Sequence, residues 1–150
     1  MSRSSVKIGS ILMHAMGWFT LVMALLWVFI TEIMFVSDFL AYTGQTYADY
    51  LAANPVFAEI YIITKRLVGF VLLGVALQIL FITKYGYEKG EKWAWVALLI
   101  AGGLLWGTLI GYRAFIGYLG GSTIAFVAGA VLYALGILIP AREIWSKEPS

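Results

Sequence analysis

The stretch YIITKRLVGFVLLGVALQILFIT, residues 61–83, decides the fold class of this protein. It is apolar over a length that crosses a bilayer as a helix, for which about 20 residues suffice. Two charged residues, Lys65 and Arg66, nevertheless stand side by side near its start. Counting back about 20 residues from Lys84, which marks the far end of this helix, puts the hydrocarbon boundary near Thr64. We therefore expect both charges at the edge of the membrane and not at its centre.

The composition of the whole chain points to a membrane environment. Hydrophobic residues make up 62% of its 150 residues, and charged residues only 12%. That leaves too few polar side chains to cover a soluble globule of this size, so lipid must be most of its solvent. Membrane spans take up nearly the whole length, which predicts one domain, residues 1–150, with no soluble catalytic domain attached.

Four stretches of the chain are long and apolar enough to cross a membrane. They cover about residues 8–36, 55–83, 93–112 and 121–141. The first follows Arg3 and Lys7, as a signal peptide would, but its apolar run exceeds the roughly 7–15 residues of such a segment. We therefore expect it to remain in the mature protein. The sequence predicts an all-α integral membrane protein, a bundle of four transmembrane helices.

The distribution of basic residues predicts the orientation in the membrane. Seven of the ten Lys and Arg residues lie before the first span, between the second and third, or after the fourth: Arg3, Lys7, Lys84, Lys89, Lys92, Arg142 and Lys147. Basic residues concentrate on the cytoplasmic side, so we expect both termini in the cytoplasm and a multi-pass protein of the cell membrane. The connection 37–54 would then face outward, and it holds Asp38 and Asp49 but no Lys or Arg.

Two local patterns lie within this outer connection. Thr46 and Asp49 have the spacing of a helix capping box, which predicts a short interfacial helix between the first and second spans. Asn54 followed by Pro55 is typical of a helix start, because Asn caps free amides and proline loses no needed donor at the first helical position. The second span is expected to begin there.

Small residues recur at every fourth position in the last two spans. One row is Gly103, Gly107 and Gly111, and the other is Gly121, Ala125 and Gly129. In lipid such rows let two helix backbones approach closely, where the hydrophobic effect gives no help. The sequence predicts that the third and fourth spans pack as a tight hairpin. The alternative is that one row forms the interface of a homo-oligomer.

Charged residues on three spans reach a similar depth on the outer side. Glu32 lies near the end of the first span and Arg113 near the end of the third. Neighbouring helical residues point about 100° apart, so Lys65 and Arg66 cannot both face one partner. We expect Lys65 to extend its amine to the lipid headgroups, and Arg66 to face the bundle, about two turns from Glu59. The predicted outer-side cluster is Glu32, Glu59, Arg66 and Arg113.

The predicted cluster has two interpretations. It is either an interhelical salt-bridge network, since unpaired charges near the membrane interior are costly, or a shallow ligand pocket. In the pocket, Arg66 and Arg113 would bind an anionic headgroup, a carboxylate or a quinone-like oxygen. Glu32 would then act as a counter-ion or proton acceptor.

Several functional classes have little support in the sequence. The chain has no cysteine, which removes thiolate catalysis, disulfide exchange and cysteine-bound metals. Its net charge of +2 and the lack of a basic stripe argue against a nucleic-acid partner. His14 is the only histidine, whereas a bis-histidine haem site needs two. We therefore predict no catalytic residues, no metal and no cofactor.

Three functions remain for a chain that consists mostly of spans and short loops. The first expectation is a non-catalytic accessory or assembly subunit of a larger membrane complex. One alternative is a small oligomeric transporter or channel, in which Glu32 is an intramembrane carboxylate. The other is a lipid- or quinone-binding membrane protein that uses the outer charged cluster. The expected partners are membrane lipids and either other membrane subunits or further copies of the chain.

Overall fold

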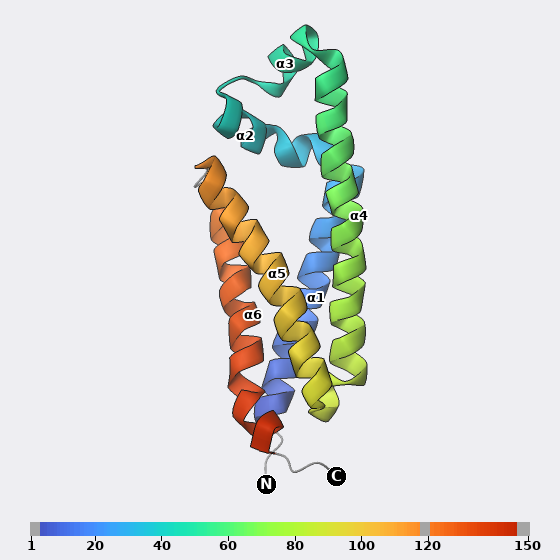
Figure 1. The fold of residues 1–150 in the computed structure, drawn as a ribbon, viewed down its shortest axis with the longest axis vertical. Coiled ribbons are helices and arrows are strands. Elements are labelled where there is room, and N and C mark those ends of the chain that lie inside the picture. The colour runs from blue at the N-terminus through green and yellow to red at the C-terminus, as the bar shows by residue number, and fades with distance from the viewer. Residues whose placement is uncertain (1–3, 118–120, 147–150) are drawn as a thin grey trace.

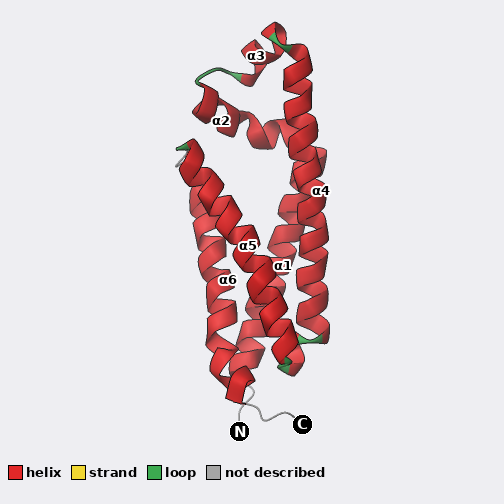
Figure 2. Cartoon of the chain, in the orientation of Figure 1, coloured by secondary structure: helices red, strands yellow, loops and turns green. Residues whose placement is uncertain are grey.

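The computed structural model describes residues 4–117 and 121–146, which are helical apart from short turns and contain no strand (Figure 2). Within these two ranges, four helices are long and apolar enough to cross a membrane. They are α1 (Ser4–Phe29), α4 (Pro55–Tyr85), α5 (Lys92–Ile116) and α6 (Gly121–Ser146). The predicted all-helical fold with four membrane-spanning helices is confirmed at this level.

The first span ends earlier than predicted. A single helix over residues 8–36 was expected, but α1 stops at Phe29, and Ile30 has φ −123° and ψ 39°, outside the helical region. A second helix, α2 (Thr31–Thr43), then runs across the end of the bundle (Figure 1). The hydroxyl of Thr31 donates to the carbonyl oxygen of Trp27 at 2.6 Å. Such bonds from a side chain back to the preceding turn often bend helices, and hydropathy does not reveal them.

Helix α2 leads into a short helix that the sequence predicted. Helix α3 (Tyr47–Ala53) begins after Thr46, whose hydroxyl accepts from the backbone N–H of Asp49 at 3.1 Å. The long helix α4 begins at Pro55, as predicted, although the Asn54 side chain makes no capping hydrogen bond. Helices α2 and α3 lie at the end of the bundle opposite the two termini, which we name the distal end (Figure 1).

At the other end, the proximal end, a single 3₁₀ turn, η1 (Tyr87–Lys89), joins α4 to α5. The hydroxyl of Tyr87 donates to the carbonyl oxygen of Gly136 at 2.5 Å. Within a regular helix that carbonyl would accept from the residue four positions later, but this residue is Pro140, which has no N–H. Tyr87 therefore supplies the donor that the proline in α6 removes.

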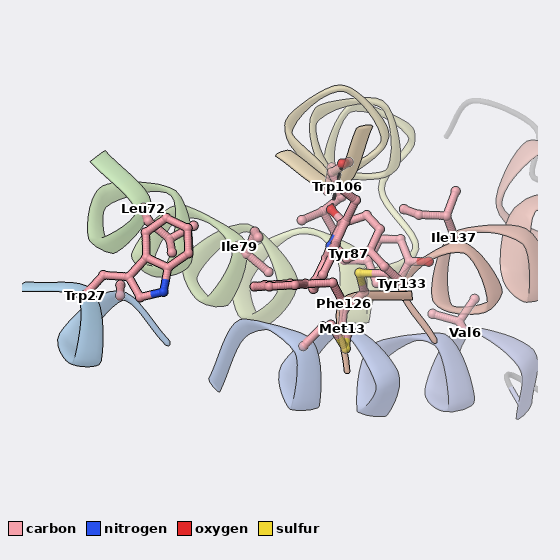
Figure 3. Close-up of a cluster of buried hydrophobic side chains, with 14 of the residues drawn as sticks. Val6, Met13, Trp27, Leu72, Ile79, Tyr87, Trp106, Phe126, Tyr133 and Ile137 are labelled. Atoms are coloured by element: carbon pink, nitrogen blue, oxygen red, sulfur yellow. Dashed lines mark hydrogen bonds between the residues drawn. The ribbon is translucent and has the colours of Figure 1, made fainter. Parts of the chain in front are cut away.

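The core runs along α1. This helix packs most extensively against α4 and next against α6, whereas α4 and α5 share a shorter contact. Buried side chains from all four long helices and η1 form one cluster, part of which is drawn in Figure 3: Val6, Met13, Trp27, Leu72, Ile79, Tyr87, Trp106, Phe126, Tyr133 and Ile137. Many large apolar side chains on the outer surfaces of the long helices remain exposed, as expected for helices that face lipid.

The predicted glycine row on α5 does not make the close contact with α6. A Cβ atom added at Gly103, Gly107 or Gly111 would meet no atom within 4 Å. The close approach occurs one residue earlier, at Gly102, where an added Cβ would overlap the ring of Tyr133. The spacing of the row was visible in the sequence, but its direction was not, because adjacent positions differ by about 100° around the helix.

The row on α6 contributes one residue to helix packing. A Cβ at Gly129 would lie 2.5 Å from the indole of Trp106, so this glycine admits the tryptophan ring. Ala125 is exposed, and the surroundings of Gly121 lie outside the described residues. The α5–α6 contact is therefore made by rings against single glycines, and not by two facing rows.

Candidate ligand-binding site at the distal end

Helix α2 carries an acidic residue into the interior of the distal end. Its buried residues are Thr31, Phe35, Asp38 and Phe39, which occupy one helical face at the spacing i, i+4, i+7 and i+8. Because α2 crosses the bundle, this face points inward and places the Asp38 carboxylate against α5.

Asp38 forms a buried ion pair with Arg113. The Nη1 of Arg113 donates to Oδ1 of Asp38 at 2.5 Å, and the two residues are 6% and 1% exposed. Both charges have lost most of their hydration, so each depends on the other for compensation. The guanidinium also lies over the ring of Phe126, with its carbon 5.0 Å from the ring centroid. The pair therefore fixes α2 to α5.

The second carboxylate oxygen of Asp38, Oδ2, is buried and has no hydrogen-bond partner among the described residues. Burial raises the pKa of Asp38 above its usual range, while the nearby charges of Arg113 and Lys65 act in the opposite direction. A neutral Asp38 would leave the buried guanidinium uncompensated, so we treat the carboxylate as ionised. An unpaired buried acceptor is costly, and a donor in the adjoining space would remove that cost.

Lys65 faces the same region. Its Nζ donates to the hydroxyl oxygen of Tyr112 at 3.0 Å. The rings of Phe35, Tyr61 and Tyr112 surround the ammonium, with centroids at 4.9, 5.3 and 4.5 Å. The electron-rich faces of aromatic rings attract a cation at such distances. Lys65 is therefore directed toward the interior of the distal end and not away from the bundle, as had been predicted.

The expected directions of the two adjacent cations are thus reversed. Arg66, expected to face the bundle, is exposed, and its Nε reaches only the hydroxyl of Thr31 at 3.4 Å. The reason is that α1 ends at Phe29, so α2 and not a straight first span meets α4 at this level. The ring-bearing face of α2 then lies against Lys65.

The predicted cluster of Glu32, Glu59, Arg66 and Arg113 does not come together. Glu32 and Glu59 are exposed, and among the described residues neither forms an ion pair. Only Arg113 belongs to the buried site. Sequence reasoning missed Asp38 as its partner because Asp38 was placed in a connecting loop, although its spacing from Phe35 and Thr31 indicated a helical face.

A cavity of about 370 Å³ opens beside these groups, between α2, α4 and α5. We name it the distal cavity; its walls include Asp38, Phe39, Tyr61, Lys65, Tyr112 and Phe115. A few convergent polar groups in a largely apolar wall are typical of small-molecule sites, and the volume lies within their usual range of about 300–1,000 Å³.

A second hollow continues along the same two helices. We name it the α4–α5 groove; it measures about 390 Å³, and its walls include Val68, Val71, Val75, Leu104 and Thr108. On α4 these residues follow the cavity residues in sequence, and on α5 they precede them, so the groove lies nearer the middle of the two helices than the distal cavity. Its wall is mostly aliphatic, with Trp27, Gln78 and Thr108 as the exceptions.

The proximal end holds the only histidine of the chain. The Nδ1 of His14 lies 3.1 Å from the carbonyl oxygen of Ser10 and 3.6 Å from a carboxylate oxygen of Glu88. A cavity of about 670 Å³ lies beside these residues and Lys7. Among the described residues, no group of three or more His, Cys, Asp or Glu side chains is placed to hold a metal ion.

The distal cavity is the better candidate site. Three helices bring an ammonium, three tyrosine side chains and a carboxylate to one partly enclosed space. The ammonium and the Tyr112 hydroxyl share a hydrogen bond, and the carboxylate is held in the buried ion pair with Arg113. These groups can bind and orient a polar ligand by charge and hydrogen bonding. Comparisons of the chain with protein-family models, with curated proteins and with solved structures find no match.

Proposed function

We propose that this protein binds a lipid-dissolved amphiphile, with the polar head in the distal cavity and the apolar chain in the α4–α5 groove. The observation that carries the proposal is the position of Lys65. Its ammonium lines a cavity, is surrounded by three rings and, among the described residues, forms no ion pair with a carboxylate. A partly buried cation of this kind favours an anionic or strongly hydrogen-bond-accepting head.

The depth of the site fits such a ligand. Tyr112 follows Lys92 by about 20 residues, which is ~30 Å of helix at the usual rise. That length matches the hydrocarbon thickness of a bilayer, so Tyr112 and its partner Lys65 come at the level of the headgroups. The groove, nearer the middle of α4 and α5, comes at the level of the chains.

The proposal takes the distal end as the outer side of the cell membrane, with both termini in the cytoplasm, because the basic residues cluster at the other end. It develops the sequence-based alternative of a lipid- or quinone-binding membrane protein, with different residues. A role as an accessory or assembly subunit, and one as a small oligomeric transporter or channel, stay predictions.

The test compares two lysines on one helix. Lys65→Gln removes the charge in the distal cavity, whereas Lys84→Gln removes an exposed charge at the proximal end of α4. The purified proteins are mixed with anionic and zwitterionic phospholipids of identical chains, and native mass spectrometry counts the bound lipids. We expect Lys65→Gln to lower the retained anionic lipid about tenfold, the usual effect of losing a charged hydrogen bond.

Lys84→Gln is expected to retain as much lipid as the unmodified protein. Equal lipid binding by the unmodified protein and Lys65→Gln would contradict the proposal.

A further inference from the structure

The charges around the distal cavity limit the kind of head that it accepts. Asp38 and Arg113 form one neutral pair, so the ammonium of Lys65 leaves a single positive charge. A head with one negative charge neutralises the site. A zwitterionic head adds no net charge, and a head with two negative charges overcompensates in a setting where unpaired charge is costly.

The unpaired acceptor limits the head further. Oδ2 of Asp38 is buried, has no donor among the described residues, and belongs to a residue in the cavity wall. A ligand that displaces the side chains covering Oδ2 and supplies an O–H or N–H there removes the cost of a buried acceptor without a partner. An ammonium donor would bring a second positive charge close to Lys65 and Arg113. A neutral hydroxyl supplies the hydrogen bond without this repulsion.

From these two constraints we infer that the ligand is a phospholipid with one negative charge and a free hydroxyl in its head, the chemistry of phosphatidylglycerol. The phosphate oxygens accept from the ammonium of Lys65 and from the hydroxyl of Tyr112. The head hydroxyl donates to Oδ2 of Asp38, and one acyl chain occupies the α4–α5 groove. This inference rests on the proposed function and specifies its ligand.

The inference is tested with three lipids that share the same acyl chains. Phosphatidylglycerol has the charge and the hydroxyl, phosphatidylmethanol has the charge alone, and phosphatidylethanolamine has a donor but no net charge. Binding to the purified protein is measured by native mass spectrometry at several lipid concentrations. We expect phosphatidylglycerol to bind about tenfold more tightly than phosphatidylmethanol, as one hydrogen bond to a charged acceptor implies, and phosphatidylethanolamine to bind most weakly.

Variants assign the preference to particular atoms. Asp38→Asn replaces the acceptor Oδ2 with an amide and is expected to reduce the preference for phosphatidylglycerol over phosphatidylmethanol to about twofold or less. Lys65→Gln is expected to weaken both anionic lipids by the same factor. If Asp38→Asn alone does not fold, the double variant Asp38→Asn with Arg113→Gln removes the acceptor together with the charge that it compensates.

The outcomes separate the inference from the proposed function. Equal binding of phosphatidylglycerol and phosphatidylmethanol, with both lost in Lys65→Gln, would overturn the hydroxyl contact and leave amphiphile binding in place. Preferential binding of phosphatidylethanolamine would overturn the assignment of the head. Lipid binding that does not change in Lys65→Gln would overturn both.

Discussion

Asp38 and Arg113 lie 75 positions apart in the sequence and share one buried hydrogen-bonded ion pair. Both residues are buried, so each charge is compensated only while its partner is present. A buried pair is often no more stabilising than two well-packed apolar residues, yet removal of one partner is strongly destabilising. The energetic role of Asp38 is therefore conditional on Arg113.

Single substitutions should expose this dependence. We expect Asp38→Asn to lower the free energy of unfolding by about 3 kcal/mol, because Arg113 stays buried without a counter-charge. The double variant Asp38→Asn with Arg113→Gln should lose less than the sum of the two single variants. Equilibrium unfolding in a denaturing detergent measures each value. Glu59→Gln, a change at an exposed carboxylate, is the control and should stay within about 0.5 kcal/mol; strict additivity would refute the coupling.

Lys65 and Arg66 show which properties of a single side chain can be predicted from the sequence. Counting residues along a helix predicts depth, and the position of Lys65 and Arg66 at the edge of the membrane stays a prediction. Their directions came out reversed, because direction depends on which element meets α4 at that level. That element is α2, and its existence as a separate helix depends on local bonds of Thr31 that hydropathy does not report.

For the helices, the starting residue could often be predicted from the sequence, whereas the rotation of a helix about its axis could not. The starts of α3 and α4 followed from Thr46 and Pro55, whereas the end of α1 at Phe29 did not follow from its apolar run. The rotation of α5 about its own axis could not be predicted in this way. Gly102 and Gly103 are adjacent glycines, so the sequence does not show which of them faces α6. Only the packed structure shows that Gly102 receives the ring of Tyr133.

Neighbouring glycines therefore offer a matched pair of substitutions. Gly102→Ala should lower the free energy of unfolding by about 1–3 kcal/mol, because a methyl group there displaces the buried Tyr133 ring. The displacement also weakens the hydrogen bond from the Tyr133 hydroxyl to the carbonyl oxygen of Leu98, now 2.7 Å. Gly103→Ala meets no atom and should be neutral or stabilising, since alanine is the better helix former. Unfolding in denaturing detergent compares the two, and equal losses would contradict this packing.

Over the whole molecule, the arrangement separates two chemically different ends. The proximal end carries both termini and most of the basic residues, and the distal end carries α2, α3 and the candidate site (Figure 1). The four spans were predictable because length and hydropathy alone define them. The site was not, since it combines α2, α4 and α5 over residues 38–116, and long-range pairing leaves no local pattern.

The orientation can be read directly, because the chain contains no cysteine and each introduced thiol is unique. Gln45→Cys lies at the exposed distal end, and Glu91→Cys at the exposed proximal turn. In intact cells we expect a membrane-impermeant maleimide to label Gln45→Cys alone, and Glu91→Cys to react only after the cells are opened, as the positive-inside rule requires. The reverse pattern would place the candidate site on the cytoplasmic side.

Helix α4 has 31 residues and α5 has 25, so at 1.5 Å per residue α4 is longer by about 9 Å. Both exceed a hydrocarbon layer of ~30 Å, but the surplus of α4 lies beyond the end of α5, where it carries α3. A membrane protein with unequal spans responds to hydrophobic mismatch. A thicker bilayer would draw Lys65 and the mouth of the distal cavity into hydrocarbon, and a thinner one would expose the α4–α5 groove to water. We therefore expect lipid binding at the distal cavity to change with the thickness of the membrane.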